Sequence, residues 1–376
     1  MASFKKLPTG WQYRVSYKDE HGKYKTKSMN GFDTKREAQL ASAEVESKLS
    51  KGYSIKSGDK LFTDYFRNWF EVYRKGKKSK DNDGDIRRAV EFAERVFPDV
   101  RLKELTREDY QRALNQYGET HSTASVKKHH TYMRAAIKDA IEEGIIFRDP
   151  TYRVLAVGKV QPKHEELKYL SYQKSTELIQ TILTGIRPDY TSRYIILFGL
   201  ATGCRFSEII GLTWDDIDFK ENTVTINKTW DYKYDNHFSN TKNYQSKRVI
   251  TVDENTLSHI KKLNIHQKEY HLKSGLKNEH GLVFLNDDME LVSNNAVNKV
   301  LRKSCAKINA TPITCHGLRH THASILLYKG VNIKYVSRRL GHKDIVTTLQ
   351  TYQHILDEME QKESSTVNQM ISNMYG

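Results

Sequence analysis

A polar segment near the middle of the chain most constrains what the sequence can fold into. Residues 158–169 read G-K-V-Q-P-K-H-E-E-L-K-Y, and they include Gly158 and Pro162. Segments of this composition usually separate compact domains. A chain of 376 residues is long enough for about two or three domains. We therefore expect separate units on the two sides of a linker at 158–169, and not one continuous core.

The first 56 residues have the pattern of a small separate module. Gln12–Tyr17 and Lys23–Met29 alternate polar with apolar residues, which predicts two strands joined by a turn at Asp19–Gly22. Thr34 and Glu37 form a capping-box pattern that predicts a helix running toward Leu49. Residues 1–56 hold 12 Lys and Arg against 6 Asp and Glu, a net charge of +6. Such a module could place its strands in a DNA groove, or it could simply carry a charged outer face.

Residues 57–157 are predicted to be helical. An aromatic stripe at helical spacing is expected to form core rather than a base-stacking surface, and it comprises Leu61, Tyr65, Phe66, Trp69, Phe70 and Tyr73. Arg74–Lys80 and Asp81–Gly84 are expected to interrupt the helices before a second helix at Arg87–Val96. A third helix should begin near Thr106, and a long one should span Ser122–Glu142 before Gly144. Residues 127–130 (K-K-H-H) either meet phosphates or form a solvated face.

Residues 170–376 are predicted to form a mixed helical domain. Thr223–Asn227 and Arg248–Val252 alternate in hydropathy and predict a hairpin between helices. The expected fold class is therefore multidomain and mainly α with small β elements. It combines a sheet-plus-helix module at 1–56, a helical domain at 57–157 and a mixed α+β domain at 170–376.

The composition narrows the class of protein. Hydrophobic residues make up 38% and charged residues 28% of the chain, as in folded globular proteins. The formal net charge of +15 favours nucleic acid as a partner, although a merely basic solvated surface has the same charge. The three cysteines form no C-x-x-C pair, and the first residues lack the apolar stretch of a signal peptide. We expect a cytoplasmic protein without a membrane segment.

Three short segments of the last domain carry the residue types of phosphate chemistry. Arg205 follows the helix-breaking Thr202-Gly203 pair and begins the next helix, where free backbone N–H groups favour an anion. His316 and Arg319 are three apart, so they share a helix face. Leu340-Gly341-His342 comes next, and Tyr352 follows it. Arginines can hold phosphate oxygens, histidines can move protons, and a tyrosine oxygen can attack.

These segments together resemble the tyrosine recombinase or phage integrase family. The resemblance rests on A-T-G-C-R-x-x-E at 201–208, H-x-L-R-H at 316–320, L-G-H at 340–342 and T-T-L-Q-T-Y at 347–352. H-x-x-R alone is common by chance, so the order and spacing of the set carry the resemblance. It covers the chain from about residue 165. Family members often place an arm-site-binding module and a helical core-site-binding domain in front, which is similar to the layout expected here.

The resemblance implies a role for each matching residue. Arg205 and Arg319 would clamp the phosphate, His316 and His342 would match the two family histidines, and Tyr352 would be the nucleophile. The second histidine position can also be tryptophan in the family. The segment T-K-x-x-x-S-x-R at 241–248 resembles the family's lysine hairpin and gives Lys242, with Lys228, Lys233 and Lys247 as competitors. Glu208 resembles a supporting acidic position, for which we expect a structural role.

The implied activity is site-specific DNA recombination through a 3′-phosphotyrosine intermediate, with integration and excision of a phage or mobile element. We expect no cofactor, no metal and no ATP, because the motif set is cationic and lacks clustered carboxylates. The alternatives are a type IB topoisomerase-like enzyme and a catalytically silent DNA-binding regulator on the same scaffold. A zinc site at His316, His320 and His322 is disfavoured, because no metal-binding motif joins them.

The resemblance also implies partners. We expect double-stranded DNA at attachment core sites and arm sites, and a homotetramer on two synapsed DNA sites. An accessory DNA-bending protein and an excisionase are further expected partners. The segment after Tyr352 could pack on a neighbouring subunit, or it could fold back on its own domain.

Overall fold

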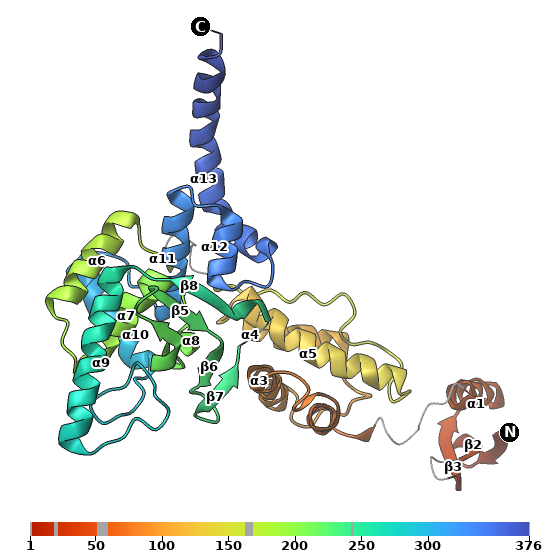
Figure 1. The fold of residues 1–376 in the computed structure, drawn as a ribbon. Helices are drawn as coiled ribbons and strands as arrows, with labels where there is room; N and C mark the ends of the chain where they lie inside the picture. The colour runs from red at the N-terminus through yellow and green to blue at the C-terminus, as the bar shows by residue number, and fades with distance from the viewer. Residues whose placement is uncertain (1, 19–21, 51–58, 162–167, 242–243, 376) are drawn as a thin grey trace. The chain divides into compact units, whose positions relative to one another are not determined.

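The computed structural model describes residues 2–18, 22–50, 59–161, 168–241 and 244–375. The chain divides into two compact units, Met1–Pro162 and Lys163–Gly376, and Figure 1 labels many of the helices and strands of each. The division falls inside the linker expected at 158–169. The finer division into three domains stays a prediction.

The N-terminal module is a three-stranded antiparallel sheet covered by one helix. β1 (Ala2–Leu7), β2 (Gly10–Lys18) and β3 (Tyr24–Phe32) lie in the order β1-β2-β3, and α1 (Lys35–Ser50) packs on β2. Two strands and the helix are confirmed, and so is the capping box, in which Glu37 N donates to Thr34 Oγ1 over 3.2 Å. β1 was not predicted, and most of the predicted turn at Asp19–Gly22 lies outside the described residues.

The helical part of the first unit has an aromatic core, as predicted. It contains α2 (Phe62–Trp69), a π-helical turn at Phe70–Arg74, α3 (Lys80–Val96), α4 (Arg107–Gly118) and α5 (Thr123–Glu142). The aromatic stripe is buried from Tyr65 to Phe70, whereas Tyr73 is exposed. Ser122 caps α5 by accepting a hydrogen bond from Ser125 N over 3.4 Å, so the predicted start of that helix is confirmed.

The predicted break at Asp81–Gly84 is wrong. α3 begins at Lys80, and Ser79 caps it by accepting a hydrogen bond from Asn82 N over 3.3 Å. Asp81 and Asp83 lie in the first turn, where negative charge stabilises the helix dipole. A polar run that resembles a loop is therefore a helix start.

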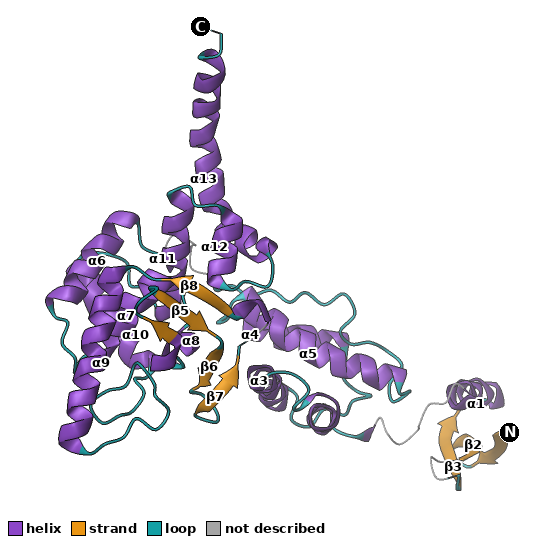
Figure 2. Cartoon of the chain, viewed as in Figure 1, coloured by secondary structure: helices purple, strands orange, loops and turns teal. Residues whose placement is uncertain are grey.

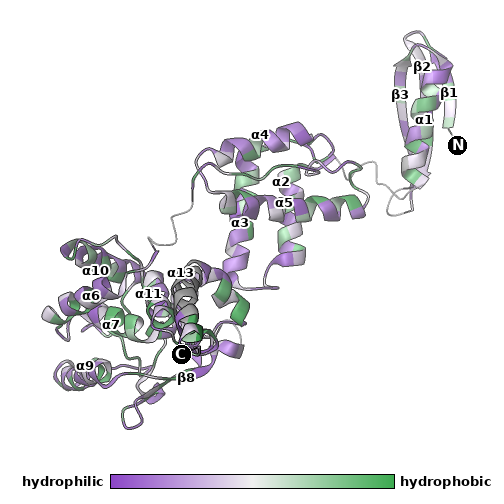
Figure 3. Cartoon of the chain, turned by 90° about the horizontal axis from the view of Figure 1, so that it is seen from above, coloured by the Kyte–Doolittle hydropathy of each residue, from purple (hydrophilic) through white to green (hydrophobic). Residues whose placement is uncertain are grey.

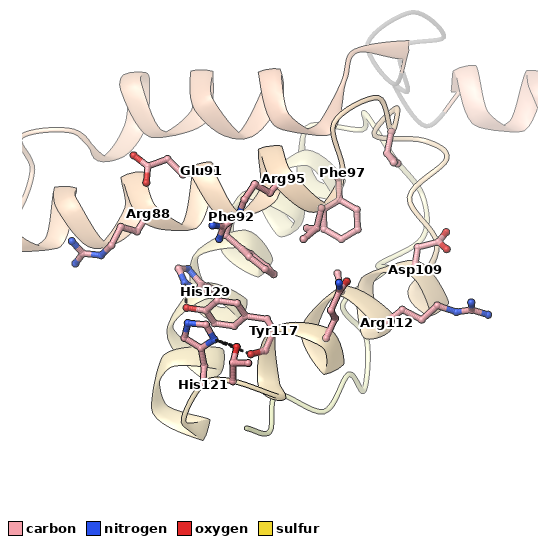
Figure 4. A pocket seen from close by; sticks show the side chains of 15 residues that line it. Arg88, Glu91, Phe92, Arg95, Phe97, Asp109, Arg112, Tyr117, His121 and His129 are labelled. Carbon is pink, nitrogen blue, oxygen red and sulfur yellow. Dashed lines mark hydrogen bonds between the residues drawn. The ribbon is translucent and has the colours of Figure 1, made fainter. Parts of the chain in front are cut away.

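Rings gather around a hollow of about 840 Å³ between α3, α4 and α5 (Figure 4). His129 of the K-K-H-H segment is buried there, and its Nε2 lies 3.0 Å from the Tyr117 hydroxyl. The Tyr117 ring also stacks on His121, with centroids 3.7 Å apart. His129 is thus neither on a solvated face nor open to a phosphate.

The first residues of the expected linker pack against the helical part. Lys159 N donates to Gly118 O over 2.8 Å, and Gly158 approaches so closely that a Cβ there would lie 2.2 Å from His121 O. Residues 162–167 lie outside the described part of the chain.

The second unit is built around one buried helix. α7 (Thr191–Thr202) has buried residues from Tyr194 to Leu200 and contacts α6 (Tyr172–Thr184), α9 (Glu254–Ser274), α10 (Asn294–Lys307) and α11 (Cys315–Tyr328), which Figure 3 colours by hydropathy. α8 (Phe206–Ile210), α12 (Ile333–Leu340) and α13 (Ile345–Ser372) complete its labelled helices. Helices predominate and the sheets are small (Figure 2), so the predicted fold class is confirmed.

The predicted strands of this unit do pair, but not as a simple hairpin. β5 (Thr223–Ile226) and β8 (Arg248–Thr251) are antiparallel neighbours in a sheet of order β4-β5-β8, with β4 at Ile217–Asp218. Between them the chain forms a separate ribbon of β6 (Lys228–Asp231) and β7 (His237–Asn240). β6 and β7 each contain a single apolar residue, Trp230 and Phe238, so no alternation revealed them. None of the described helices has the length and apolar character needed to span a membrane.

Candidate active site

Arg205 is placed by a sharp chain reversal after α7. The helix ends at Thr202, and Gly203 continues with a φ of +68°, a conformation that favours glycine. A Cβ on Gly203 would lie 2.7 Å from the His322 ring, so this close approach also requires glycine. Arg205 then begins α8, and its backbone N–H donates to Glu208 Oε2 over 2.9 Å. The predicted position of Arg205 at a helix start is confirmed.

Glu208 is buried and bridges two arginines. Arg205 Nη1 donates to Glu208 Oε1 over 2.8 Å, and Arg248 Nη2 donates to Glu208 Oε2 over 2.9 Å. Burial alone would raise the pKa of Glu208. The charge and hydrogen bonds of Arg248, with the charge of Arg205, outweigh burial and hold that pKa below its ordinary value. The carboxylate therefore stays ionised and orients the Arg205 guanidinium.

Arg248 also joins the β8 strand to α12. Its Nε donates to Arg339 O over 2.6 Å, and its side chain is only 7% exposed. Arg248 is the last residue of the T-K-x-x-x-S-x-R pattern, but the sequence suggested no role for it. Nothing in that pattern indicates that its partner Glu208 lies 40 residues earlier.

Arg319 is a buried cation with an incomplete set of partners. Its side chain lies on α11 and the residue is 3% exposed, with Nη1 donating to Gly203 O over 2.9 Å. Nη2 is also buried and has no hydrogen-bond partner in the described part of the protein. Burial, followed by the charge of Arg205, lowers the pKa of Arg319 to about 10. A charged donor held this way is stabilised by an incoming anion.

The histidines of α11 separate into two groups. The His316 and His320 rings meet edge to face with centroids 4.7 Å apart, and the His320 centroid lies 5.7 Å from that of Tyr352. His322 is directed elsewhere, with Nδ1 2.8 Å from Leu200 O and Nε2 accepting from Arg339 Nε over 3.0 Å. His322 therefore links α7 to α12. The contact of His320 with Tyr352 was not expected from the sequence.

The surroundings of His316 and His342 lower the pKa of both rings and so favour their neutral forms. His316 remains open to solvent, and partial burial, with the charges of Arg319 and Arg205, lowers its pKa. Burial and then the charges of Arg319, Arg205 and Arg248 lower the pKa of His342 to about 3. His342 follows Gly341, which ends α12 with a φ of +66°. Its Nδ1 lies 2.6 Å from Thr348 Oγ1.

Tyr352 is buried in this conformation. It is 2% exposed and belongs to a cluster with Ala323, Leu327, Val336 and Leu340. The backbone of α13 is non-helical at this one residue, with a φ of −118° and a ψ of 18°. A negative charge on Tyr352 would raise the pKa of Arg319, so the phenol lies within electrostatic reach of that guanidinium.

Lys242 lies outside the described residues, so the structure does not test it. Of its competitors, Lys228 is held by Asp216 and by Thr213 Oγ1 at 3.1 Å. Lys247 is exposed. Among the residues that the structure describes, no three His, Cys, Asp or Glu side chains form a group that could hold a metal ion.

Residues 168–359 of the chain match the phage integrase family, and residues 3–49 match an arm DNA-binding domain. The first match covers slightly more than half of the chain, so the chain belongs to the phage integrase family. It is a tyrosine-type site-specific recombinase. The topoisomerase-like and catalytically silent alternatives are not favoured.

Two relatives align along most of the chain. The integrase of Staphylococcus phage L54a is 24% identical over 353 residues, covering 87% of this chain and 99% of that protein. A tyrosine recombinase XerC-like protein of Caldanaerobacter subterraneus subsp. tengcongensis is 26% identical over 385 aligned residues, covering 95% of this chain and 96% of that protein.

Solved structures share the fold. The Tn1549 transposon integrase in complex with transposon right end DNA has a TM-score of 0.65 at 18% identity, covering 80% of this chain and 99% of that chain. A lambda integrase dimer bound to a COC′ core site has a TM-score of 0.61 at 16% identity, covering 93% of each chain.

Proposed function

We propose that Tyr352 attacks a phosphodiester of double-stranded DNA held by Arg205 and Arg319. The phenol oxygen forms a bond to phosphorus, the bond to the 5′-oxygen breaks, and a 3′-phosphotyrosine and a free 5′-hydroxyl result. A second 5′-hydroxyl reverses the step on another strand. One phosphoester replaces another each time, so the reaction needs no ATP.

The observation that carries this proposal is Nη2 of Arg319, which has no hydrogen-bond partner among the described residues. A buried guanidinium nitrogen without a partner costs free energy unless an anion supplies acceptor oxygens. A phosphodiester supplies two non-bridging oxygens, and guanidinium groups match their geometry. The negative charge on these oxygens grows in the transition state, so the same donors stabilise it more strongly than the ground state.

Other side chains of the site would accept and donate the protons. A neutral His316 can accept the phenol proton of Tyr352, because its lowered pKa keeps a nitrogen lone pair available near neutrality. His342 donates a hydrogen bond to the phosphate. Lys242 is the candidate that protonates the leaving 5′-oxygen, on the family resemblance alone.

Tyr352 must move before it can react. At 2% exposure its phenol cannot contact a phosphate of an intact duplex. The kink in α13 at this residue marks where the backbone already departs from helix geometry. We propose that DNA binding releases Tyr352 from its cluster with Leu327 and Leu340.

We propose attachment-site DNA as the partner at two places, with core sites bound by residues 57–157 and 170–376 and arm sites by residues 1–56. The match of residues 3–49 to an arm DNA-binding domain supports the second. On β2 the side chains of Arg14 and Lys18 are exposed on the sheet face away from buried Tyr13 and Val15. The chain would integrate and excise a phage or mobile element in the cytoplasm.

We also propose a homotetramer on two synapsed DNA sites. A lambda integrase tetramer bound to a Holliday junction shares the fold, with a TM-score of 0.59. Val367, Met370 and Ile371 of α13 are exposed and apolar, which suits packing on a neighbouring subunit. Deletion after Asp357 should impair tetramer assembly more than DNA binding, and equal loss of both would refute this role of the tail. A DNA-bending protein and an excisionase remain proposed accessory partners.

The decisive experiment incubates the protein with a nicked duplex that carries its core site. Wild type should form a protein–DNA adduct that survives denaturation, with and without a chelator, and Tyr352→Phe should form none. Tyr194→Phe, which changes another buried tyrosine of the same unit, is the control and should still form the adduct. An adduct on a different side chain, or one abolished by chelator, would refute the proposal. Relaxation of a plasmid lacking the site would favour the topoisomerase alternative.

A further inference from the structure

The hydroxyl of Thr348 has an unusual partner for a threonine inside a helix. Such hydroxyls commonly bond to the carbonyl one turn earlier, as Thr351 Oγ1 does to Thr347 O over 2.6 Å. Thr348 Oγ1 instead lies 2.6 Å from Nδ1 of His342, six residues earlier in the chain. Thr348 is completely buried, so water does not compete for this bond.

The direction of this bond decides which nitrogen of His342 carries a proton. A neutral imidazole has one N–H donor and one acceptor nitrogen. Burial and the surrounding guanidinium groups favour the neutral ring before DNA arrives. If the Thr348 hydroxyl donates to Nδ1, the proton must lie on Nε2. Only that tautomer leaves Nε2–H free to donate to a phosphate oxygen.

We propose that Thr348 is a positioning residue that sets the Nε2–H tautomer of His342 and thereby orients its donor toward the phosphate. Thr348 and Tyr352 are four residues apart on α13 and both are buried, so they share a helix face. One hydrogen bond therefore couples the phosphate donor to the helix that carries the nucleophile. This inference rests on the role proposed above for His342.

The kinetic test uses adduct formation on the nicked core-site duplex. Thr348→Val keeps the shape of the side chain and removes the hydroxyl, and it should slow adduct formation about tenfold, the effect of one lost hydrogen bond. Thr348→Ser keeps the hydroxyl and should restore the rate to within about twofold. Thr351→Val removes a hydroxyl that bonds to Thr347 O of its own helix, and it should leave the rate unchanged. Failure of serine to restore the rate would overturn the proposal.

A double-mutant cycle separates tautomer control from packing. Tryptophan has a single N–H donor and no acceptor nitrogen, so it needs no tautomer-setting partner. In a His342→Trp background, Thr348→Val should therefore change the rate less than about twofold. An equal slowing in both backgrounds would show that Thr348 acts through packing and would overturn the proposal.

Nitrogen-15 NMR of histidine-labelled protein tests the inference without any reaction. His342, identified by the signal lost in His342→Trp, should show a protonated Nε2 and an unprotonated Nδ1. Thr348→Val should shift the two ring-nitrogen signals of His342 toward the values of a tautomer mixture, and Thr348→Ser should not. An Nδ1–H ring in wild type would overturn the inference. If no adduct formed at Tyr352, the proposed function would fail while this spectrum still tested Thr348.

Discussion

The ring-lined hollow of the first unit and the active site of the second contain the same kinds of residue, but they use them differently. At the hollow, Arg88 pairs with Asp85 and Arg112 with Glu108, and both arginine side chains are mostly exposed, at 63% and 74%. In the candidate active site, the side chains of Arg248 and Arg319 are buried, and one nitrogen of Arg319 has no partner in the part of the chain that the structure describes. Arg74 Nε and Arg134 Nε of the first unit are also buried without a hydrogen-bond partner among the described residues, but both arginines are partly exposed. The candidate site is distinguished by Arg319, which is buried as a whole residue and still has an unpaired donor, and not by its arginine content.

The histidines of the two regions sharpen this point. Burial lowers the pKa of His129 at the hollow to about 4, and burial with nearby guanidinium groups lowers that of His342 to about 3. Within the described ranges His129 Nδ1 also lacks a partner, but a neutral ring nitrogen costs far less to leave unpaired than a charged donor. A lowered histidine pKa alone would not have told these regions apart.

Among the substitutions that test this comparison, the largest effect is expected at Arg319. Arg319→Lys removes the planar donors that meet both Gly203 O and an incoming phosphate, and it should slow adduct formation by about 10²–10³-fold. The matched change in the other region, Arg112→Lys, alters an exposed arginine and should leave the rate within about twofold. Similar rates for the two variants would contradict the comparison.

Removing the charge that bridges two arginines should strongly reduce stability. Glu208→Gln leaves Arg248 buried without its anion, and the free energy of unfolding at pH 7 should fall by about 3 kcal/mol, measured by urea denaturation. Glu91→Gln at the hollow changes an exposed carboxylate and should alter stability by less than about 0.5 kcal/mol.

The ion pair of Glu208 with Arg248 also predicts that stability depends on pH. The pKa of Glu208 is lowered in the folded protein, so its ionised form stabilises the fold above the unfolded carboxyl pKa of about 4.3. This contribution is lost as the pH falls through the lower folded pKa. The stability gap between wild type and Glu208→Gln should therefore narrow at acidic pH, and a gap that widens would refute the ion-pair account.

The smallest expected effect is at His129. Its pKa of about 4 lies below the unfolded value of about 6.5, so wild type loses stability as the pH falls between these values. His129→Phe should cost about 1 kcal/mol at pH 7, because the Tyr117 hydroxyl loses a partner. Between pH 7 and pH 5, the free energy of unfolding of the variant should rise relative to that of wild type by about 1–2 kcal/mol. An unchanged difference at the two pH values would show that His129 is not held neutral by burial.

Much of the local structure was predictable because its causes lie within one helical turn. Ser122 and the Thr34–Glu37 pair identified helix starts through side-chain caps. The same reasoning failed at Asp81–Gly84, where polar residues that suit a loop also suit a first helical turn beside Ser79. The β6–β7 ribbon was not predicted because each of its strands contains a single apolar residue and therefore shows no alternation.

The order of Arg205, His316, Arg319, His342 and Tyr352 along the chain was sufficient to identify the family and the chemistry, because each lies in a short motif. The catalytic roles of these residues, like that of Lys242, stay predictions. The partners of these residues come from the tertiary structure alone. Arg248 reaches Glu208 across 40 residues and Arg339 reaches His322 across 17, and neither pair shares a motif.

What the sequence alone determined is the family, a set of candidate reacting groups and the starts of several helices, since these depend on neighbours within a few residues. Only the tertiary structure decided that Tyr352 is buried, that Thr348 contacts His342, and that a nitrogen of Arg319 has no partner among the residues described. Burial and hydrogen-bond pairing depend on which distant segments pack together, and that information is spread over the whole second unit.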